Sequence, residues 1–145
     1  MRGYSGSFPH KLDQKGKVSV PTSFRRELGE RVVLTQGTDD RYVWLFPLDR
    51  WAEMVEKITA LPNSEKAKNV RRFLLGSAHE VEVDRVGRIQ VPQALREYAD
   101  IDAKSVMFIG MGDTIEIWEK EKRDKLSARI VKEKNIQRDM EDLGI

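Results

Sequence analysis

A nine-residue stretch occurs twice in this chain, and the second copy lies 71 residues after the first. The first copy, from Asp13 to Pro21, reads DQKGKVSVP, and the second, from Asp84 to Pro92, reads DRVGRIQVP. An aspartate, a glycine, a long cation, an aliphatic residue, a valine and a proline stand in register in both. Such an internal repeat indicates that one supersecondary unit is used twice.

The size of the repeat predicts one shared core rather than two independent domains. The chain has 145 residues, and a unit of about 45 residues is marginal as an independent core. Hydrophobic residues make up 39% of the chain and charged residues 34%, which is typical of a folded, globular protein rather than a disordered one.

Alternating residues on both sides of the repeated turn predict paired strands. In the second copy, Val81 and Val83 alternate with glutamates, and Ile89 and Val91 flank a glutamine. A period of two is the mark of half-buried strands. We therefore expect a hairpin over residues 8–20 and a second one at the equivalent place in the other copy.

The turn between these strands has the pattern Asp-x-x-Gly-cation. An aspartate side chain can accept a hydrogen bond from the main chain two residues on, and glycine adopts positive φ at no steric cost. We expect Asp13 and Asp84 to hold their turns or to orient the cation four residues on. Gly16 and Gly87 are expected in the left-handed region.

The prolines that end the two copies each predict a short helix, because proline fits the first helical turn and is excluded from central strands. The helices are expected over residues 22–28 and 93–98, and two strands are expected after each helix. These strands are predicted over residues 31–35, 41–46, 105–110 and 114–118. Each unit is thus strand, strand, short helix, strand, strand.

Helical sequence separates the repeats and ends the chain. Asp49 is expected to cap a first linker helix, and Ser64 a second helix that ends before Gly76. The segment from Glu119 onward is strongly helix-forming, with a charged surface and narrow apolar stripes. Such a stripe needs something to pack against, either the core or a neighbouring subunit.

Positive charge gathers around the first repeated loop. The net charge is only +2, but residues 1–26 hold six lysines and arginines against one acid. If the two loops lie side by side, their cations can face the phosphates or base edges of DNA. The candidate DNA-binding residues are Lys11, Lys15, Lys17, Arg85 and Arg88.

Two further arginines recur at the repeat offset, Arg25 and Arg96, on the predicted short helices. For these we favour a structural salt bridge, with a loop aspartate as the candidate partner, over contact with the DNA backbone.

Several function classes lack support in the sequence. The chain has no cysteine, which excludes a disulfide framework and cysteine-based zinc sites. No apolar run approaches the ~18 residues of a membrane span, and no apolar signal segment opens the sequence. His10 and His79 do not align under the repeat offset, and no triad or metal-ligand spacing is visible. We expect a cytoplasmic protein that is not an enzyme, with no metal, cofactor, membrane or small-molecule substrate.

Together these motifs resemble the MraZ family, which carries the SpoVT/AbrB-type barrel in tandem. The resemblance rests on the paired loops, on RRFLLGSA over residues 71–78 and on IEIW over residues 115–118, and it covers roughly residues 1–120. It implies a mainly β fold with short helices (α+β), a swapped-hairpin β-barrel pseudo-dimer with linker helices and a C-terminal helix. The implied organisation is repeat 1 over 7–49, linker over 50–77, repeat 2 over 78–121 and helical tail over 122–145.

The resemblance also implies a function. Family members form closed rings and bind repeated double-stranded DNA upstream of the division and cell-wall gene cluster, including their own promoter, through Asp-x-x-x-Arg loops. This implies a homo-oligomeric, nucleoid-associated regulator, with Asp84 and Arg88 as the motif residues of the second loop. In the first loop, Asp13 matches the motif but Lys17 replaces its arginine. Lysine is a point charge, whereas arginine offers a planar fork for guanine.

Two alternatives come from the same type of barrel, an antitoxin and a nucleoid-associated scaffold. The tandem repeat in one chain and the lack of a long disordered tail argue against an antitoxin. Co-purification of a toxin would favour it.

Overall fold

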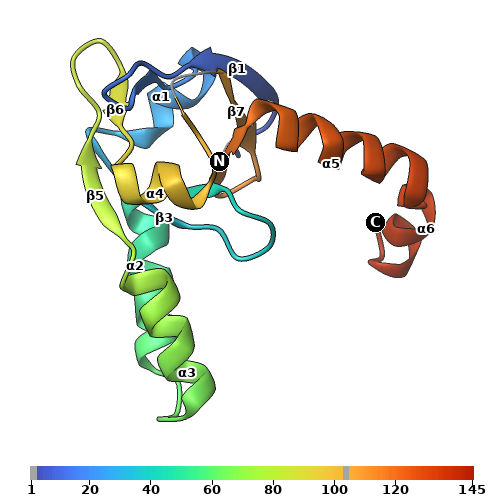
Figure 1. The fold of residues 1–145 in the computed structure, drawn as a ribbon. Helices are drawn as coiled ribbons and strands as arrows, with labels where there is room; N and C mark the ends of the chain where they lie inside the picture. Colours follow the sequence, from blue (N-terminus) through green and yellow to red (C-terminus); the bar gives the residue numbers. More distant parts are fainter. Residues whose placement is uncertain (1–2, 103–104) are drawn as a thin grey trace.

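The computed structural model describes residues 3–102 and 105–145, and each repeat has the predicted order of elements (Figure 1). The first repeat consists of β1 (Ser7–Lys11), β2 (Lys17–Ser19), α1 (Thr22–Leu28), β3 (Arg31–Gln36) and β4 (Val43–Pro47). The second consists of β5 (His79–Glu82), β6 (Arg88–Gln90), α4 (Gln93–Tyr98), β7 (Ser105–Gly110) and β8 (Ile115–Glu119). Between them lie α2 (Leu48–Thr59), α3 (Glu65–Val70) and the π-helix η1 (Arg71–Leu75), and α5 (Lys120–Glu133) and α6 (Ile136–Asp142) end the chain.

The two repeats exchange strands. One antiparallel sheet has the order β1-β7-β8-β4-β3-β5, so β1 of the first repeat pairs with β7 of the second, and β5 of the second pairs with β3 of the first. A second, two-stranded sheet joins β2 to β6, with Val18 opposite Ile89. The fold is therefore the expected tandem swapped-hairpin barrel, mainly β with short helices.

The simple hairpin predicted over residues 8–20 is wrong. β1 and β2 do follow one another around a tight turn, in which the Asp13 N–H donates to the Lys17 carbonyl at 2.9 Å. Each strand then pairs with a strand of the other repeat rather than with its neighbour in sequence. The exchange gives the main-chain groups of both strands partners in the other repeat and joins the two halves into one core.

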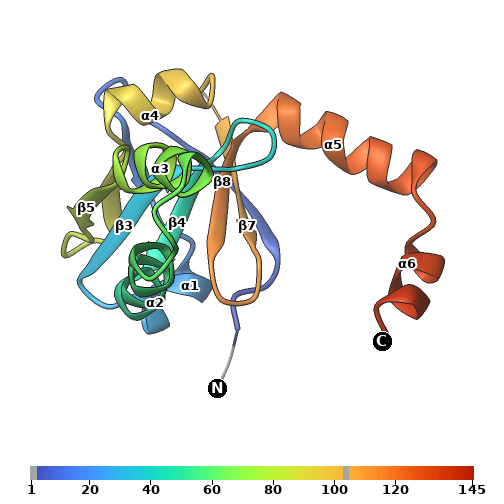
Figure 2. The same ribbon diagram turned by 90° about the horizontal axis from the view of Figure 1, so that it is seen from below.

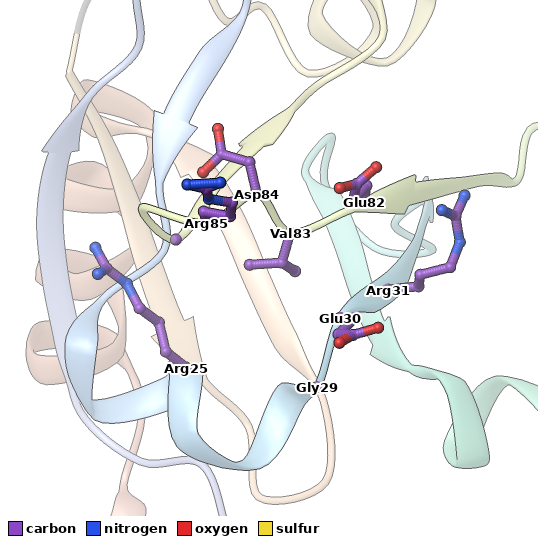
Figure 3. Close-up of a pocket in the computed structure, with 9 residues that line it drawn as sticks. Arg25, Gly29, Glu30, Arg31, Glu82, Val83, Asp84 and Arg85 are labelled. Carbon is purple, nitrogen blue, oxygen red and sulfur yellow. The ribbon is translucent and has the colours of Figure 1, made fainter.

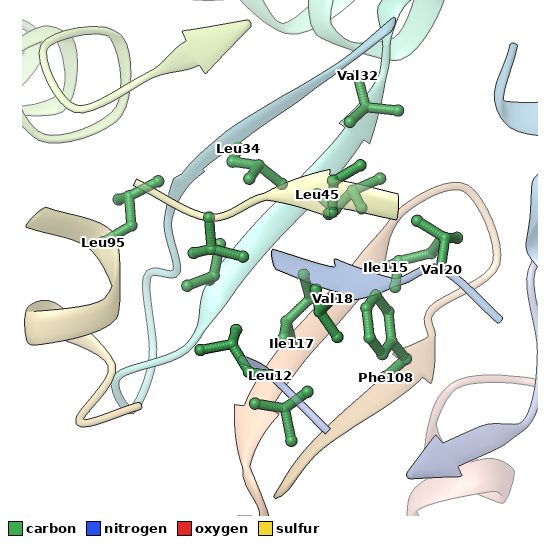
Figure 4. Close-up of a cluster of buried hydrophobic side chains, with 14 of the residues drawn as sticks. Leu12, Val18, Val20, Val32, Leu34, Leu45, Leu95, Phe108, Ile115 and Ile117 are labelled. Atoms are coloured by element: carbon green, nitrogen blue, oxygen red, sulfur yellow. The ribbon is translucent and has the colours of Figure 1, made fainter. Parts of the chain in front are cut away.

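The core lies inside this barrel and is built from matched positions of both repeats (Figure 4). Val20 and Val91, which precede the two repeated prolines, are fully buried. Phe24 and Leu95, the equivalent residues of α1 and α4, are each 1% exposed. Because the apolar positions of both copies fill one interior, neither repeat has a core of its own.

Of the two predicted caps of the linker helices, one is confirmed and one is wrong. Ser64 caps α3 as expected, because its hydroxyl accepts the Ala67 N–H at 3.1 Å. Asp49 does not cap α2: the helix begins at Leu48, directly after Pro47, and the Asp49 carboxylate accepts the N–H of Arg50 instead. Proline fixes its own φ, so the helix starts before Asp49 and places this residue in the first turn.

The C-terminal helices project from the barrel as an arm, away from the linker helices (Figures 1 and 2). Glu119 caps α5, and the Lys122 ammonium fastens its base by donating to the Arg41 carbonyl at 2.8 Å. From Ile130 onward, the large apolar side chains of this arm are exposed, among them Val131 of α5 and Leu143, directly after α6. Within residues 3–102 and 105–145, no helix combines the length and apolar content that crossing a membrane requires.

Candidate nucleic-acid interface

Both repeated turns are held by their aspartate, as predicted. Asp13 Oδ1 accepts the main-chain N–H groups of Lys15 and Lys17, each at 2.9 Å. In the second loop, Asp84 Oδ1 accepts from the residues two and four positions on, at 3.0 and 2.9 Å. The glycines have φ of 88° at Gly16 and 83° at Gly87. The two loops therefore have the same conformation.

The same bonds set the charge of the loops. The N–H of Lys17 lowers the pKa of the Asp13 carboxyl, and the N–H of Arg88 does the same for Asp84. Both carboxyls are thus ionised at neutral pH. Asp84 also contacts two cations through Oδ2, the Nε of Arg88 at 3.3 Å and the Nζ of Lys17 at 3.7 Å. Asp84 therefore orients the cation four residues on as well as holding the turn.

Main-chain bonds tie each loop to the other repeat. The Val20 N–H donates to the Gly87 carbonyl at 2.8 Å, and the Val91 N–H donates to the Gly16 carbonyl at the same distance. The Gln90 side-chain amide donates to the Lys15 carbonyl. Gln90 was not predicted as a site residue, although its position as a polar residue in the repeated strand placed it on an outward face. The loops thus flank the β2–β6 ribbon.

Arg25 and Arg96 do not form the predicted salt bridge to a loop aspartate. Among the described residues, the Nε of Arg25 donates to the Val20 carbonyl at 2.7 Å, and that of Arg96 donates to the Val91 carbonyl at 3.0 Å. Each carbonyl belongs to a fully buried residue just before a proline, and a buried carbonyl requires a donor. The recurrence of both arginines at the repeat offset indicated a shared structural role, but it did not identify these main-chain partners.

The predicted cations differ in exposure. Lys15, Arg85 and Arg88 are exposed, whereas Lys17 is half-buried at the start of β2. Lys11 is exposed at the end of β1, where it lies opposite Ser105 of β7. The structure brings Lys17 and Arg88 together around one carboxylate, and it places the other cations on or beside the two loops.

A cavity of about 630 Å³ lies beside the second loop (Figure 3). Arg25 enters it from α1, and Asp84 and Arg85 line it from the loop. Equal numbers of acidic and basic side chains line this cavity, so its wall has no excess of either charge. The exposed cations of the loops suit an extended polyanion better than this cavity does, because arginine and lysine bind phosphates and arginine also recognises guanine.

Two strand-exchanged repeats with matched Asp-x-x-Gly-cation loops define a tandem barrel. The model of the family described as "MraZ protein, putative antitoxin-like" matches residues 4–73 and again residues 74–144. The chain belongs to the MraZ family.

Curated relatives support this assignment over most of the chain. A protein named Transcriptional regulator MraZ from Caldanaerobacter subterraneus subsp. tengcongensis is 46% identical over 117 residues, which cover 80% of each chain. The protein of the same name from Caldicellulosiruptor saccharolyticus is 43% identical over 143 residues, 97% of this chain and 98% of the relative. Among solved structures, the solution structure of PHS018 from Pyrococcus horikoshii covers 77% of this chain and 94% of its own, with 13% identity and a TM-score of 0.37, a similarity too small to bear on the fold.

Proposed function

We propose that this chain is a transcriptional regulator that binds double-stranded DNA in a sequence-specific manner through its two repeated loops. The observation that carries the proposal is the clustering of Lys17 and Arg88, from different repeats, around Asp84 on the outer side of the β2–β6 ribbon. The names of the curated relatives support the same class of protein.

The two loop cations have different tasks in this proposal. Arg88 is exposed, and its Nε donates a hydrogen bond to Asp84. This bond orients the guanidinium and leaves its two terminal amino groups for DNA. A guanidinium held in this way suits a guanine edge in the major groove. Lys17 supplies a point charge for a phosphate, and the exposed Lys11, Lys15 and Arg85 add phosphate contacts.

Assembly completes the proposal. One chain carries a single pair of loops, which is few contacts for a specific site, and a ring of subunits would present several pairs to a repeated operator. Linked sites bind more tightly because each further contact forms at a high effective concentration. By the family resemblance, that operator lies near the chain's own promoter in the division and cell-wall gene cluster. The mechanism uses no cofactor, and it places the protein in the cytoplasm on the nucleoid.

The direct test is footprinting of the purified protein on the DNA immediately upstream of its own gene. We expect protection at regularly spaced repeats, lost in Arg88→Ala. Uniform protection of all sequences would favour the nucleoid-scaffold alternative. The description of the matched family also contains the term antitoxin-like, so the protein should be purified from its host as well. A toxin that co-purifies in a fixed ratio would favour the antitoxin function instead.

A further inference from the structure

We propose that Arg25 and Arg96 are positioning residues that set the DNA-binding loop of the opposite repeat. Arg25, on α1 of the first repeat, would fix the loop that carries Arg88. Arg96, on α4 of the second repeat, would fix the loop that carries Lys17. This inference rests on the proposed function, and it assigns to two residues outside the loops the task of aiming the loop cations.

The geometry that carries it is the contact between each guanidinium and a loop glycine. A Cβ atom added to Gly87 would overlap the Nε and Cζ atoms of Arg25, and one added to Gly16 would lie 2.7 Å from the Nε of Arg96. Each planar group therefore lies directly against the main chain of the other repeat's turn. Figure 3 shows the Arg25 side chain rising from α1 toward the loop that holds Asp84 and Arg85.

Hydrogen bonds through Val20 hold the Arg25 guanidinium and the Gly87 turn in place relative to each other. The Nε of Arg25 donates to the Val20 carbonyl, while the N–H of the same Val20 donates to the Gly87 carbonyl. One fully buried residue therefore holds both the guanidinium and the loop glycine. Arg88 directly follows Gly87, so a tilt of this turn would displace the guanidinium that we assign to base recognition.

A positioning role differs from a phosphate contact in what it requires of Arg25. A phosphate contact requires positive charge, which lysine also has. The observed packing requires a flat group with its Nε in a fixed place, which lysine lacks. The Nε of the half-buried Arg25 already donates to a main-chain carbonyl. Arg25→Lys therefore separates the two roles, because it keeps the charge and removes the plane.

The experiment measures binding of the full-length variants to two duplexes, the fragment immediately upstream of the gene and a scrambled fragment of equal composition. We expect Arg25→Lys and Arg25→Gln to lower the ratio of the two affinities by about tenfold. This loss lies within the base discrimination that one bidentate contact provides. We expect the salt dependence of Arg25→Lys to remain that of the wild type. A wild-type ratio in Arg25→Lys, with Arg25→Gln weakening both duplexes by similar factors and flattening the salt dependence, would overturn the inference in favour of a phosphate contact.

A double-mutant cycle supplies the matched control. If Arg25 acts through Arg88, adding Arg25→Lys to Arg88→Ala should cause no further fall in the affinity ratio. Arg96→Lys is chemically the same change on the other loop, so it should weaken binding further when added to Arg88→Ala. Independent effects of Arg25 and Arg88 on the ratio would refute positioning. If Arg88→Ala alone leaves the ratio unchanged, the proposed function fails together with this inference, whereas failure of Arg25→Lys alone overturns only the inference.

Hydrogen exchange in the absence of DNA tests the same connection without a binding assay. We expect Arg25→Lys to speed amide exchange in residues 84–88 more than in residues 13–17, and Arg96→Lys to show the reverse. Exchange that rises equally in both loops, or across the whole barrel, would mean that the arginines serve overall stability and would contradict the inference.

Discussion

The Nζ of Lys17 lies 3.7 Å from Oδ2 of Asp84, so the cation of the first loop approaches the carboxylate of the second. Arg88 contacts the same oxygen from its own loop, with its Nε at 3.3 Å. The two cations therefore share one acid, although they belong to repeats 71 residues apart in sequence. This arrangement makes the pseudo-dimer asymmetric at the place where we propose that it meets DNA.

The first prediction separates the tasks of these two cations. We expect Arg88→Ala to reduce discrimination between operator and scrambled DNA by about 1–3 kcal/mol, the value of one bidentate base contact. Lys17→Ala should weaken both duplexes by similar factors and flatten the log–log salt dependence by about 0.9 for each phosphate that Lys17 neutralises. Lys17→Arg should hold or improve operator binding. Titrations at several salt concentrations measure all three, and unchanged affinities in both alanine variants would exclude the loops as the DNA surface.

The second prediction concerns the two turn glycines. Gly112 is the reference position, because it has φ of 90° and open space around it. Gly112→Ala should lower the free energy of unfolding only by the ~1–2 kcal/mol of a left-handed residue. Gly87→Ala should cost somewhat more, because its new methyl group displaces the Arg25 side chain. Gly16→Ala should cost the most, because its methyl group also meets the Val91 carbonyl at 2.8 Å. Denaturant unfolding at one fixed protein concentration measures the order, and equal costs at Gly16 and Gly112 would contradict it.

Gly87→Val should weaken operator binding, with the fold retained because the strain is local to this turn.

The third prediction concerns the joint between the linker and the barrel. The Oγ1 of the fully buried Thr35 donates to the Leu74 carbonyl at 2.6 Å and lies 2.8 Å from the Ser77 hydroxyl. Thr35→Val keeps the shape but leaves a buried carbonyl without this donor, so we expect a loss of about 1–3 kcal/mol. Thr59→Val is the matched control, because the Thr59 hydroxyl is exposed and donates to carbonyls of its own helix. Similar losses of unfolding free energy in both variants would refute the prediction.

The fourth prediction concerns pH. Burial raises the pKa of Glu116, and the nearby Asp39 raises it further, although Trp118 donates a hydrogen bond to its carboxylate. Because the pKa of Glu116 is higher in the folded state than in the unfolded state, protonated Glu116 stabilises the fold at low pH. This contribution to the free energy of unfolding is lost as pH rises through the folded-state pKa. Glu116→Gln, whose side-chain oxygen can still accept from Trp118, should therefore match the wild type below pH 4.5, the ordinary value for glutamate, and melt at a higher temperature near pH 7. A difference between the two melting temperatures that does not change with pH would contradict this.

The fifth prediction concerns assembly. The side chains of Val131 and Leu143 are 78% and 76% exposed on the projecting arm, and apolar surface that projects in this way suits a contact between copies. Light scattering at micromolar protein should give a mass well above that of a dimer. Val131→Asp should lower the mass, and the neighbouring Lys132→Asp, which removes no apolar surface, should change it less. A monomeric mass for the wild type would end the ring proposal.

Much of the site was predictable because its signals are local. Asp13 and Gly16 define a turn by their side-chain and main-chain preferences, and the same preferences recur at Asp84 and Gly87. The position of Ser64 at a helix start followed from a short-range capping bond in the same way. Asp49 failed as a cap because Pro47 supplied a competing local start for the helix.

The sequence by itself determined the local geometry: the order of strands and helices in each repeat, the two turns and the cations that they present. These depend on residues within a few positions of one another. Only the tertiary structure decided which strands pair, that Arg25 lies on Gly87 rather than on a carboxylate, and that Lys17 reaches Asp84. The physical reason is that each half-barrel leaves strand edges and buried carbonyls without partners, and the other repeat satisfies them. A local pattern specifies the need for a partner, and folding of the whole chain selects which residue meets it.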